Sequence, residues 1–87
     1  MKVELGKIVA TPGALRAVSE LCIMQALFRH VQGDWGDVCR EDREANDWAL
    51  SHGERLLSSY HTKEHVKFWI ITEADRSVTT VLLPEEY

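Results

Sequence analysis

Hydrophobic residues recur at helical spacing in the first third of the chain, in steps of three and four residues. Thr11 and Pro12 precede this stripe, as an N-cap and a first helical residue do, and Gly33 follows it as a typical helix stop. The spacing therefore predicts one long amphipathic helix between Pro12 and Gly33. Its buried stripe is expected to contain Ala14, Ala17, Leu21, Met24, Phe28 and Val31.

A second, shorter helix is predicted after the turn at residues 34–37. Asp37 is expected to cap it, Gly53 to end it, and the acidic residues 41, 42 and 44 to lie near its positive end. The apolar positions are few, so the helix should bury only a narrow face, formed by Val38, Ala45, Trp48 and Ala49.

From Arg55 onward the hydrophobic period changes to two, which is typical of strands. Strands are predicted at about residues 55–61, 66–72 and 77–83, and Pro84 ends the last one. A further strand is expected over residues 2–10, with Gly6 as a candidate bulge. The predicted order is β-α-α-β-β-β. This is a single α+β domain over residues 1–87, an antiparallel meander with helices packed on one face.

Both faces of the meander are apolar, and two helices can cover only one of them. Hairpin loops of even length would place His61 opposite Val66 and Thr72 opposite Ser77. In that register, one face is predicted to be an interaction surface. A covering by the first strand and loops, a homodimer and a different protein partner remain alternatives for this face. Its residues are Tyr60, Lys67, Trp69, Ile71, Glu73 and Arg76.

The GDWGD turn at residues 33–37 is a second candidate for recognition, through Asp34, Trp35 and Asp37. A tryptophan in such a turn is more typical of an anchor to the core, and recognition of a partner is the alternative. The turn has too few oxygen ligands at the spacing that a calcium loop requires.

Residues capable of catalysis or metal binding are scattered. His61 and His65 lack a third convergent ligand, Cys22 and Cys39 have no CxxC spacing, and no nucleophile or phosphate-loop motif occurs. His30 and His52 fit helix ends, and Glu73 with Arg76 fits a surface ion pair. We therefore expect no metal, no cofactor and no disulfide, and the pattern favours a protein that is not an enzyme.

The formal net charge of −4 disfavours broad nucleic-acid binding, and residues 34–57 alone carry seven acidic and three basic side chains. The chain has no apolar run long enough to span a bilayer, and its start does not suit a signal peptide. These features favour a cytoplasmic protein without a membrane partner.

Residues 33–87 resemble a family of small bacterial proteins of plasmids and integrated elements, known as plasmid-related proteins. The resemblance rests on the GDWG turn, the Asn46-Asp47 pair and the WIITEADRSVTT hairpin. In that family a glycine often occupies the turn before the KxWIITE strand, where this chain has Glu64 and His65. The resemblance implies a bacterial, cytosolic, mobile-element setting and brings no activity or catalytic residues.

Together these features predict a non-enzymatic protein-binding or accessory protein of bacterial mobile elements, which meets another protein or itself. The acidic residues 34–57 could imitate nucleic-acid charge, although such a run is more typical of a solvated face. RNA binding or cleavage is the alternative, because Tyr60, Lys67, Trp69, Arg76 and His61 are residue types that stack on bases or contact phosphate.

Overall fold

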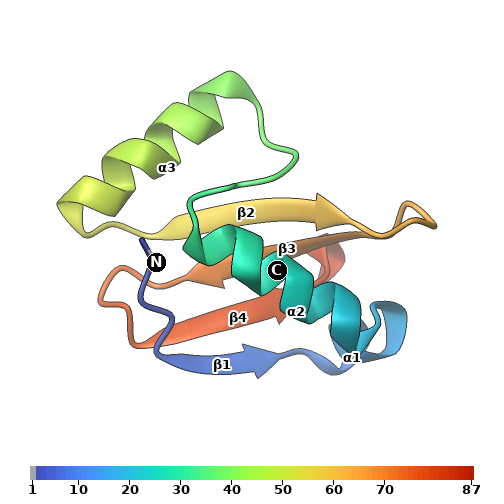
Figure 1. Cartoon of the computed structure of the whole chain (residues 1–87). Coiled ribbons are helices and arrows are strands. Elements are labelled where there is room, and N and C mark those ends of the chain that lie inside the picture. Colours follow the sequence, from blue (N-terminus) through green and yellow to red (C-terminus); the bar gives the residue numbers. More distant parts are fainter. Residues whose placement is uncertain (1) are drawn as a thin grey trace.

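The computed structural model describes residues 2–87, which form a four-stranded sheet with helices on one face and beside one edge (Figure 1). The α+β class predicted from the sequence is confirmed, with three helices rather than two. In chain order the elements are β1 (Lys7–Ala10), α1 (Pro12–Ala17), α2 (Glu20–Val31), α3 (Arg40–His52), β2 (Leu56–His61), β3 (Lys67–Thr72), β4 (Val78–Leu82) and the 3-10 turn η1 (Pro84–Glu86).

The sheet is mixed, with the strand order β1-β4-β3-β2. Strands β2, β3 and β4 form the predicted antiparallel meander, while β1 pairs parallel with β4. The predicted first strand over residues 2–10 is shorter and begins only at Lys7, directly after Gly6. Gly6 has φ +61, and a Cβ there would lie 2.4 Å from the carbonyl oxygen of Arg76, so only glycine fits this entry into β1.

The single long helix predicted from the apolar stripe is wrong, because the chain breaks at Val18 and Ser19. Val18 is extended, with φ −126 and ψ 129. The Ser19 hydroxyl then caps a new helix by accepting from the Cys22 amide at 3.2 Å. Thr11 caps α1 in the same way, through the Ala14 amide at 3.1 Å.

This break changes which side of the helix meets the sheet. Ile23, Ala26 and His30 face the core in α2, with Ala14 and Val18 before them. Leu21, Met24 and Phe28, which the uninterrupted stripe predicted to be buried, are 65%, 59% and 67% exposed. The buried side chains of α1 and α2 cover one face of the sheet, where they meet Tyr60, Phe68, Ile70 and Val81.

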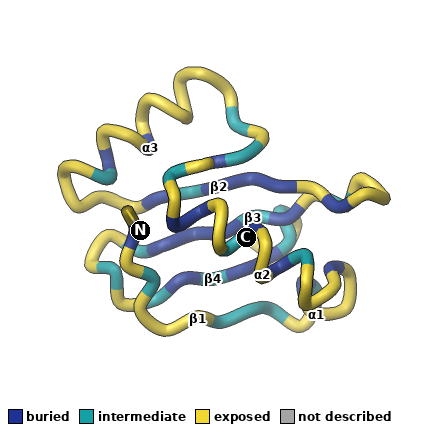
Figure 2. The backbone as a smooth tube through the Cα atoms, in the orientation of Figure 1, coloured by how far each residue is buried: buried dark blue, intermediate teal, exposed yellow. Residues whose placement is uncertain are grey.

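Helix α3 lies beside β2 rather than over the sheet, and most of its surface is exposed (Figures 1 and 2). It begins at Arg40 with Cys39 as its N-cap, so the predicted cap at Asp37 is wrong. Trp48, predicted to be buried, is 55% exposed and stacks on His52. A second core cluster joins α3 to the sheet edge and contains Val3, Trp35, Ala49 and Leu56.

The register of the first hairpin differs by one residue from the prediction. His61 pairs with Lys67 and Tyr60 with Phe68, because the loop holds five residues and His65 adopts a left-handed φ of 66. The slip moves all side chains of β2 to the opposite face from the one predicted. The second hairpin pairs Thr72 with Thr79, a shift of two residues that preserves the faces of β3 and β4.

Candidate interaction surface

The interaction face predicted from the sequence is not formed as one surface, because Tyr60 and Trp69 lie on opposite faces of the sheet. Tyr60 belongs to the helix-covered core and is only 2% exposed. Its hydroxyl donates to the Asp34 carbonyl at 2.6 Å, and burial raises its pKa to about 12. The one-residue slip in the first hairpin is the physical reason for this difference.

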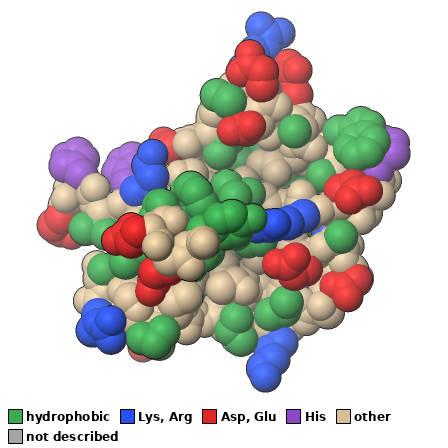
Figure 3. Space-filling model, turned by 180° about the vertical axis from the view of Figure 1, so that it is seen from behind, with side chains coloured by type: hydrophobic (Ala, Val, Ile, Leu, Met, Phe, Trp, Pro, Cys, Tyr) green, Lys and Arg blue, Asp and Glu red, His purple; other side chains and the backbone are tan. Residues whose placement is uncertain are grey.

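Trp69, Ile71 and Lys67 do lie on the far face of the sheet. The C-terminal segment folds back over this face, and the Tyr87 ring meets Trp69 edge-on with centroids 5.8 Å apart. Ile71 is buried, Trp69 is half-buried and Lys67 is exposed. Seen from behind, hydrophobic side chains gather in the middle of the molecule among acidic and basic ones (Figure 3). Much of this apolar face is therefore covered by the chain itself.

Arg76 and Glu73 are not the surface ion pair that the sequence predicts. The Arg76 guanidinium instead donates to backbone carbonyls, at 2.6 Å to Glu54 and 3.4 Å to Ala49. A cation near the last carbonyls of α3 complements the negative end of that helix. Through these hydrogen bonds Arg76 joins the second hairpin to the end of α3.

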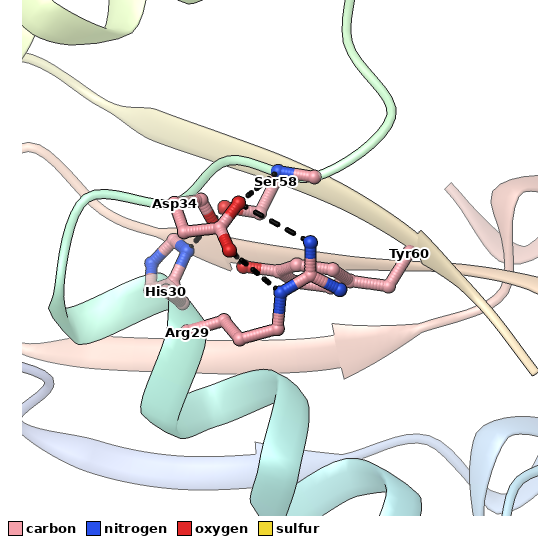
Figure 4. A network of polar contacts seen from close by, with 6 residues as sticks. Arg29, His30, Asp34, Ser58 and Tyr60 are labelled. Atoms are coloured by element: carbon pink, nitrogen blue, oxygen red, sulfur yellow. Dashed lines mark hydrogen bonds and ion pairs between the residues drawn. The ribbon is translucent and has the colours of Figure 1, made fainter.

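The GDWGD turn is bound to the fold at each of its candidate recognition residues. Trp35 is 3% exposed, and its Nε1 donates to Asp47 on α3 at 2.9 Å, so it anchors the turn in the core. Asp37 pairs with Nδ1 of His61. The Asp34 carboxylate forms a bidentate pair with Arg29 at 2.8 and 3.2 Å, which lowers its pKa (Figure 4).

The Arg29 guanidinium also lies over the Tyr60 ring, 4.8 Å from its centroid (Figure 4). Beside this stack is a small hollow of about 110 Å³, lined in part by Cys22, Gln25 and His61. Ligand sites for small molecules usually exceed roughly 300 Å³. The hollow is therefore large enough for a few water molecules and too small for a substrate of ordinary size.

His30 lies in the last turn of α2, at a helix end as predicted, and it is fully buried. Its Nδ1 lies 2.6 Å from the Ser58 hydroxyl, and its Nε2 lies 2.9 Å from the Thr72 hydroxyl. The Ser58–His30 pair has the contact distance of a nucleophile and its base, but neither side chain reaches the surface. This pair is part of the core rather than an active site.

A further apolar surface lies uncovered on the outer side of α2. Leu21, Met24 and Phe28 recur there at helical spacing, opposite the core-facing Ile23. They continue onto β1, where Ile8 is 50% exposed. Between the helix and the strand runs an open groove of about 330 Å³, lined by Leu5, Ile8, Met24, Leu27, Phe28 and Val31. We call Ile8, Leu21, Met24 and Phe28 the α2 surface.

Sequence reasoning missed the α2 surface because it placed these residues in the core. Two signals were available. Val18 is followed by Ser19, a strong N-cap residue with the start of a new apolar period behind it. In addition, α2 carries apolar residues on both sides, whereas a helix that packs on one side only usually has a polar outer face.

The two edge strands of the sheet differ in whether other parts of the chain pair with their outer backbone groups. At β2, the Asn46 amide pairs with both backbone groups of Leu57, at 2.8 and 3.1 Å. Next to it, Ser59 exchanges backbone hydrogen bonds with Trp35 and Asp37. At the other end of the sheet, β1 has β4 as its only neighbour among the strands of residues 2–87. The β2 edge is thus closed by the chain, and the β1 edge is open.

Comparisons with known proteins identify no relative: no family model matches the chain, and neither curated proteins nor solved structures show a significant match. Within residues 2–87, no helix is long and apolar enough to cross a membrane, and no three His, Cys, Asp or Glu side chains converge as a metal site. The geometry of the surfaces therefore has to carry the functional argument.

Proposed function

We propose that the chain is a non-enzymatic protein-binding protein, an accessory protein of bacterial mobile elements, and that the α2 surface is its binding site. The mobile-element setting comes from the resemblance of residues 33–87 to plasmid-related proteins. The binding site comes from the structure. One observation carries it: α2 is apolar toward solvent as well as toward the core, with Leu21, Met24 and Phe28 all about two-thirds exposed.

The size of the α2 surface supports this proposal. At roughly 200 Å² for a large apolar side chain, its four residues leave on the order of 500 Å² in contact with water. A contiguous patch near the upper end of the roughly 300–600 Å² seen on monomers is often a binding site. Its residues are aliphatic, aromatic or thioether side chains, which suit a protein partner and offer no cation for phosphate.

The RNA alternative is less well supported. It rested on Tyr60, Trp69, Lys67, Arg76 and His61 acting together, and they do not share a surface. Tyr60 is buried under α2, and Arg76 is bound to backbone carbonyls. Lys67, Trp69 and His61 remain on the far face, but Trp69 is half-buried beside Tyr87, which leaves little of its ring for base stacking.

Site-specific photo-crosslinking in cells tests the proposed function. A photoreactive phenylalanine analogue replaces Phe28 in one variant and Trp48 in the control. Trp48 is a matched control because it is similarly exposed, at 55%, but lies on α3 away from the α2 surface. We expect crosslinked protein adducts from position 28 and few from position 48. Equal yields at both positions, or no adduct at position 28, would contradict the proposal.

A further inference from the structure

The backbone of β1 offers unpaired hydrogen-bonding groups at the sheet edge. The amides of Lys7 and Thr11 donate to Ser77 and Val81 on the β4 side, each at 3.0 Å. Backbone groups alternate in direction along a strand, so those of Ile8 and Ala10 point away from β4. This edge therefore presents two N–H donors and two C=O acceptors in the pattern that another strand would complete.

That pattern is complementary to itself. If two β1 strands meet antiparallel about a two-fold axis at Val9, Ile8 of each copy lies opposite Ala10 of the other. All four donors and all four acceptors of the two copies are then paired. Lys7, the only charged residue of β1, comes to lie opposite Thr11 of the second copy, so no like charges face each other.

Part of the α2 surface lies next to the same strand edge, whereas Leu21 lies toward the first hairpin, beside Lys63 and Glu64. The groove lined by Ile8, Met24 and Phe28 connects the edge of β1 with the outer side of α2, so both belong to one continuous region. A standard interface buries roughly 800 Å² per partner, and Ile8, Met24 and Phe28 expose on the order of 350 Å² beside this edge, somewhat less than half of that area. The strand edge and its polar rim can supply the rest.

The β1 and β2 edges of the sheet differ in how far the chain covers them, and this difference also favours a second β1 strand as the neighbour of β1. The chain closes β2 with the Asn46 amide and the backbone of the GDWGD turn, whereas no side-chain amide or further strand from residues 2–87 pairs with the outer edge of β1. We propose that the partner at the α2 surface is a second copy of this chain, paired through β1 into a continuous eight-stranded sheet. This inference rests on the proposed function and names the partner of the same surface.

Sedimentation of the purified chain over a dilution series provides the first test. We expect the wild-type chain to dimerise and Phe28→Asp to raise the dissociation constant at least tenfold, since it buries a charge in the apolar contact. Trp48→Asp is the control and should dimerise like the wild type. A wild type that stays monomeric throughout, or a Phe28→Asp variant that dimerises equally well, would overturn the inference.

Disulfide trapping tests the position of the axis. Residues opposite each other in a non-hydrogen-bonded antiparallel pair have Cα atoms about 4.5 Å apart, within disulfide range. Val9→Cys should therefore form a covalent dimer under mild oxidation. Lys7→Cys should not, because two copies of residue 7 would be about 13 Å apart. The wild type, with Cys22 and Cys39, gives the background. A dimer that Lys7→Cys traps as well as Val9→Cys does would refute pairing about Val9.

The two proposals fail in different ways. If position 28 crosslinks only to other proteins and the purified chain is monomeric, the protein-binding function stands and the second copy is wrong. If position 28 gives no adduct above the Trp48 control, the proposed function itself is wrong. An adduct of twice the chain mass, absent at position 48, supports both.

Discussion

Nε2 of His30 contacts the hydroxyl of Thr72 at 2.9 Å inside the core and so joins the last turn of α2 to β3. The direction of this bond follows from its neighbours. Thr79 donates to the Leu5 carbonyl, so Thr72 donates to Thr79 and must accept from Nε2 of His30. Nδ1 then accepts from Ser58. The buried chain of hydrogen bonds therefore places a proton on Nε2 of His30, and in the neutral ring Nδ1 is the acceptor.

We expect this buried histidine to make the fold sensitive to acid. Burial, helped by the positive charge of Arg76, lowers the pKa of His30 to about 4 from an ordinary value near 6.5. Between these values the unfolded chain binds a proton that the folded chain excludes. The free energy of unfolding is therefore unaffected by the protonation of His30 above about pH 6.5. It falls as the pH drops toward 4, by about 3 kcal/mol for this one group.

Urea denaturation at pH 7, 5 and 4 measures this effect. His30→Gln should be less stable at pH 7 and should lose most of the pH dependence in this window, because glutamine does not titrate. His52→Gln is the control, since His52 lies exposed at the end of α3. If the wild type and His30→Gln show the same dependence on pH, the buried neutral histidine is not its source.

Gly36 should tolerate no side chain. Its φ is +77, and a Cβ would lie 2.1 Å from the Ser59 carbonyl, against which the GDWGD turn runs. We expect Gly36→Ala to lower the free energy of unfolding by about 3 kcal/mol or more. Gly53→Ala is the control that measures the cost of the left-handed backbone without a steric clash. Gly53 has φ +68, but a Cβ there would have no atom within 4 Å. This substitution should cost only about 1–2 kcal/mol in the same denaturation experiment.

Asn46 is expected to be a main stabilising contact of α3, since its amide completes the edge of β2 at Leu57. Asn46→Ala leaves a backbone donor and acceptor without partners and should cost about 1–3 kcal/mol. Ser51→Ala on the exposed side of α3 should change stability by less than about 0.5 kcal/mol. A loss for Asn46→Ala no larger than that of Ser51→Ala would show that the amide does not hold the helix.

Local signals in the sequence predicted much of the fold. The period-two strands, the capping by Thr11 and Pro12 and the stop at Gly53 are all present, because each depends on neighbouring residues alone. The first hairpin could not be predicted in the same way. Its register depends on His65 adopting a left-handed conformation, which is uncommon for any residue other than glycine.

The candidate site was harder to predict, because it depends on tertiary contacts. From the sequence, Arg76 fits a surface ion pair with Glu73, whereas in the fold α3 brings its last carbonyls within reach of the guanidinium. The position of His30 at a helix end is visible in the sequence, but its two hydroxyl partners come from β2 and β3 and are not. The α2 surface itself follows from a break at Ser19, whose N-cap signal competes with the helix propensity of the surrounding residues, which would allow the helix to continue.

Leu21 and Ile23 provide the most direct test of that break. In an uninterrupted helix from Pro12 to Gly33, Leu21 lies on the buried stripe, and Leu21→Ala would cost about 2–5 kcal/mol. In the structure Leu21 is 65% exposed and Ile23 is 8% exposed. Ile23→Ala should therefore carry the loss of about 2–5 kcal/mol, and Leu21→Ala should change the stability of the monomer by less than about 0.5 kcal/mol. Chemical denaturation of both variants in the Phe28→Asp background, where the α2 surface is expected to be unoccupied, distinguishes folding from association. A large loss for Leu21→Ala in that background would mean that the outer side of α2 is core, and the binding surface would have to be sought elsewhere.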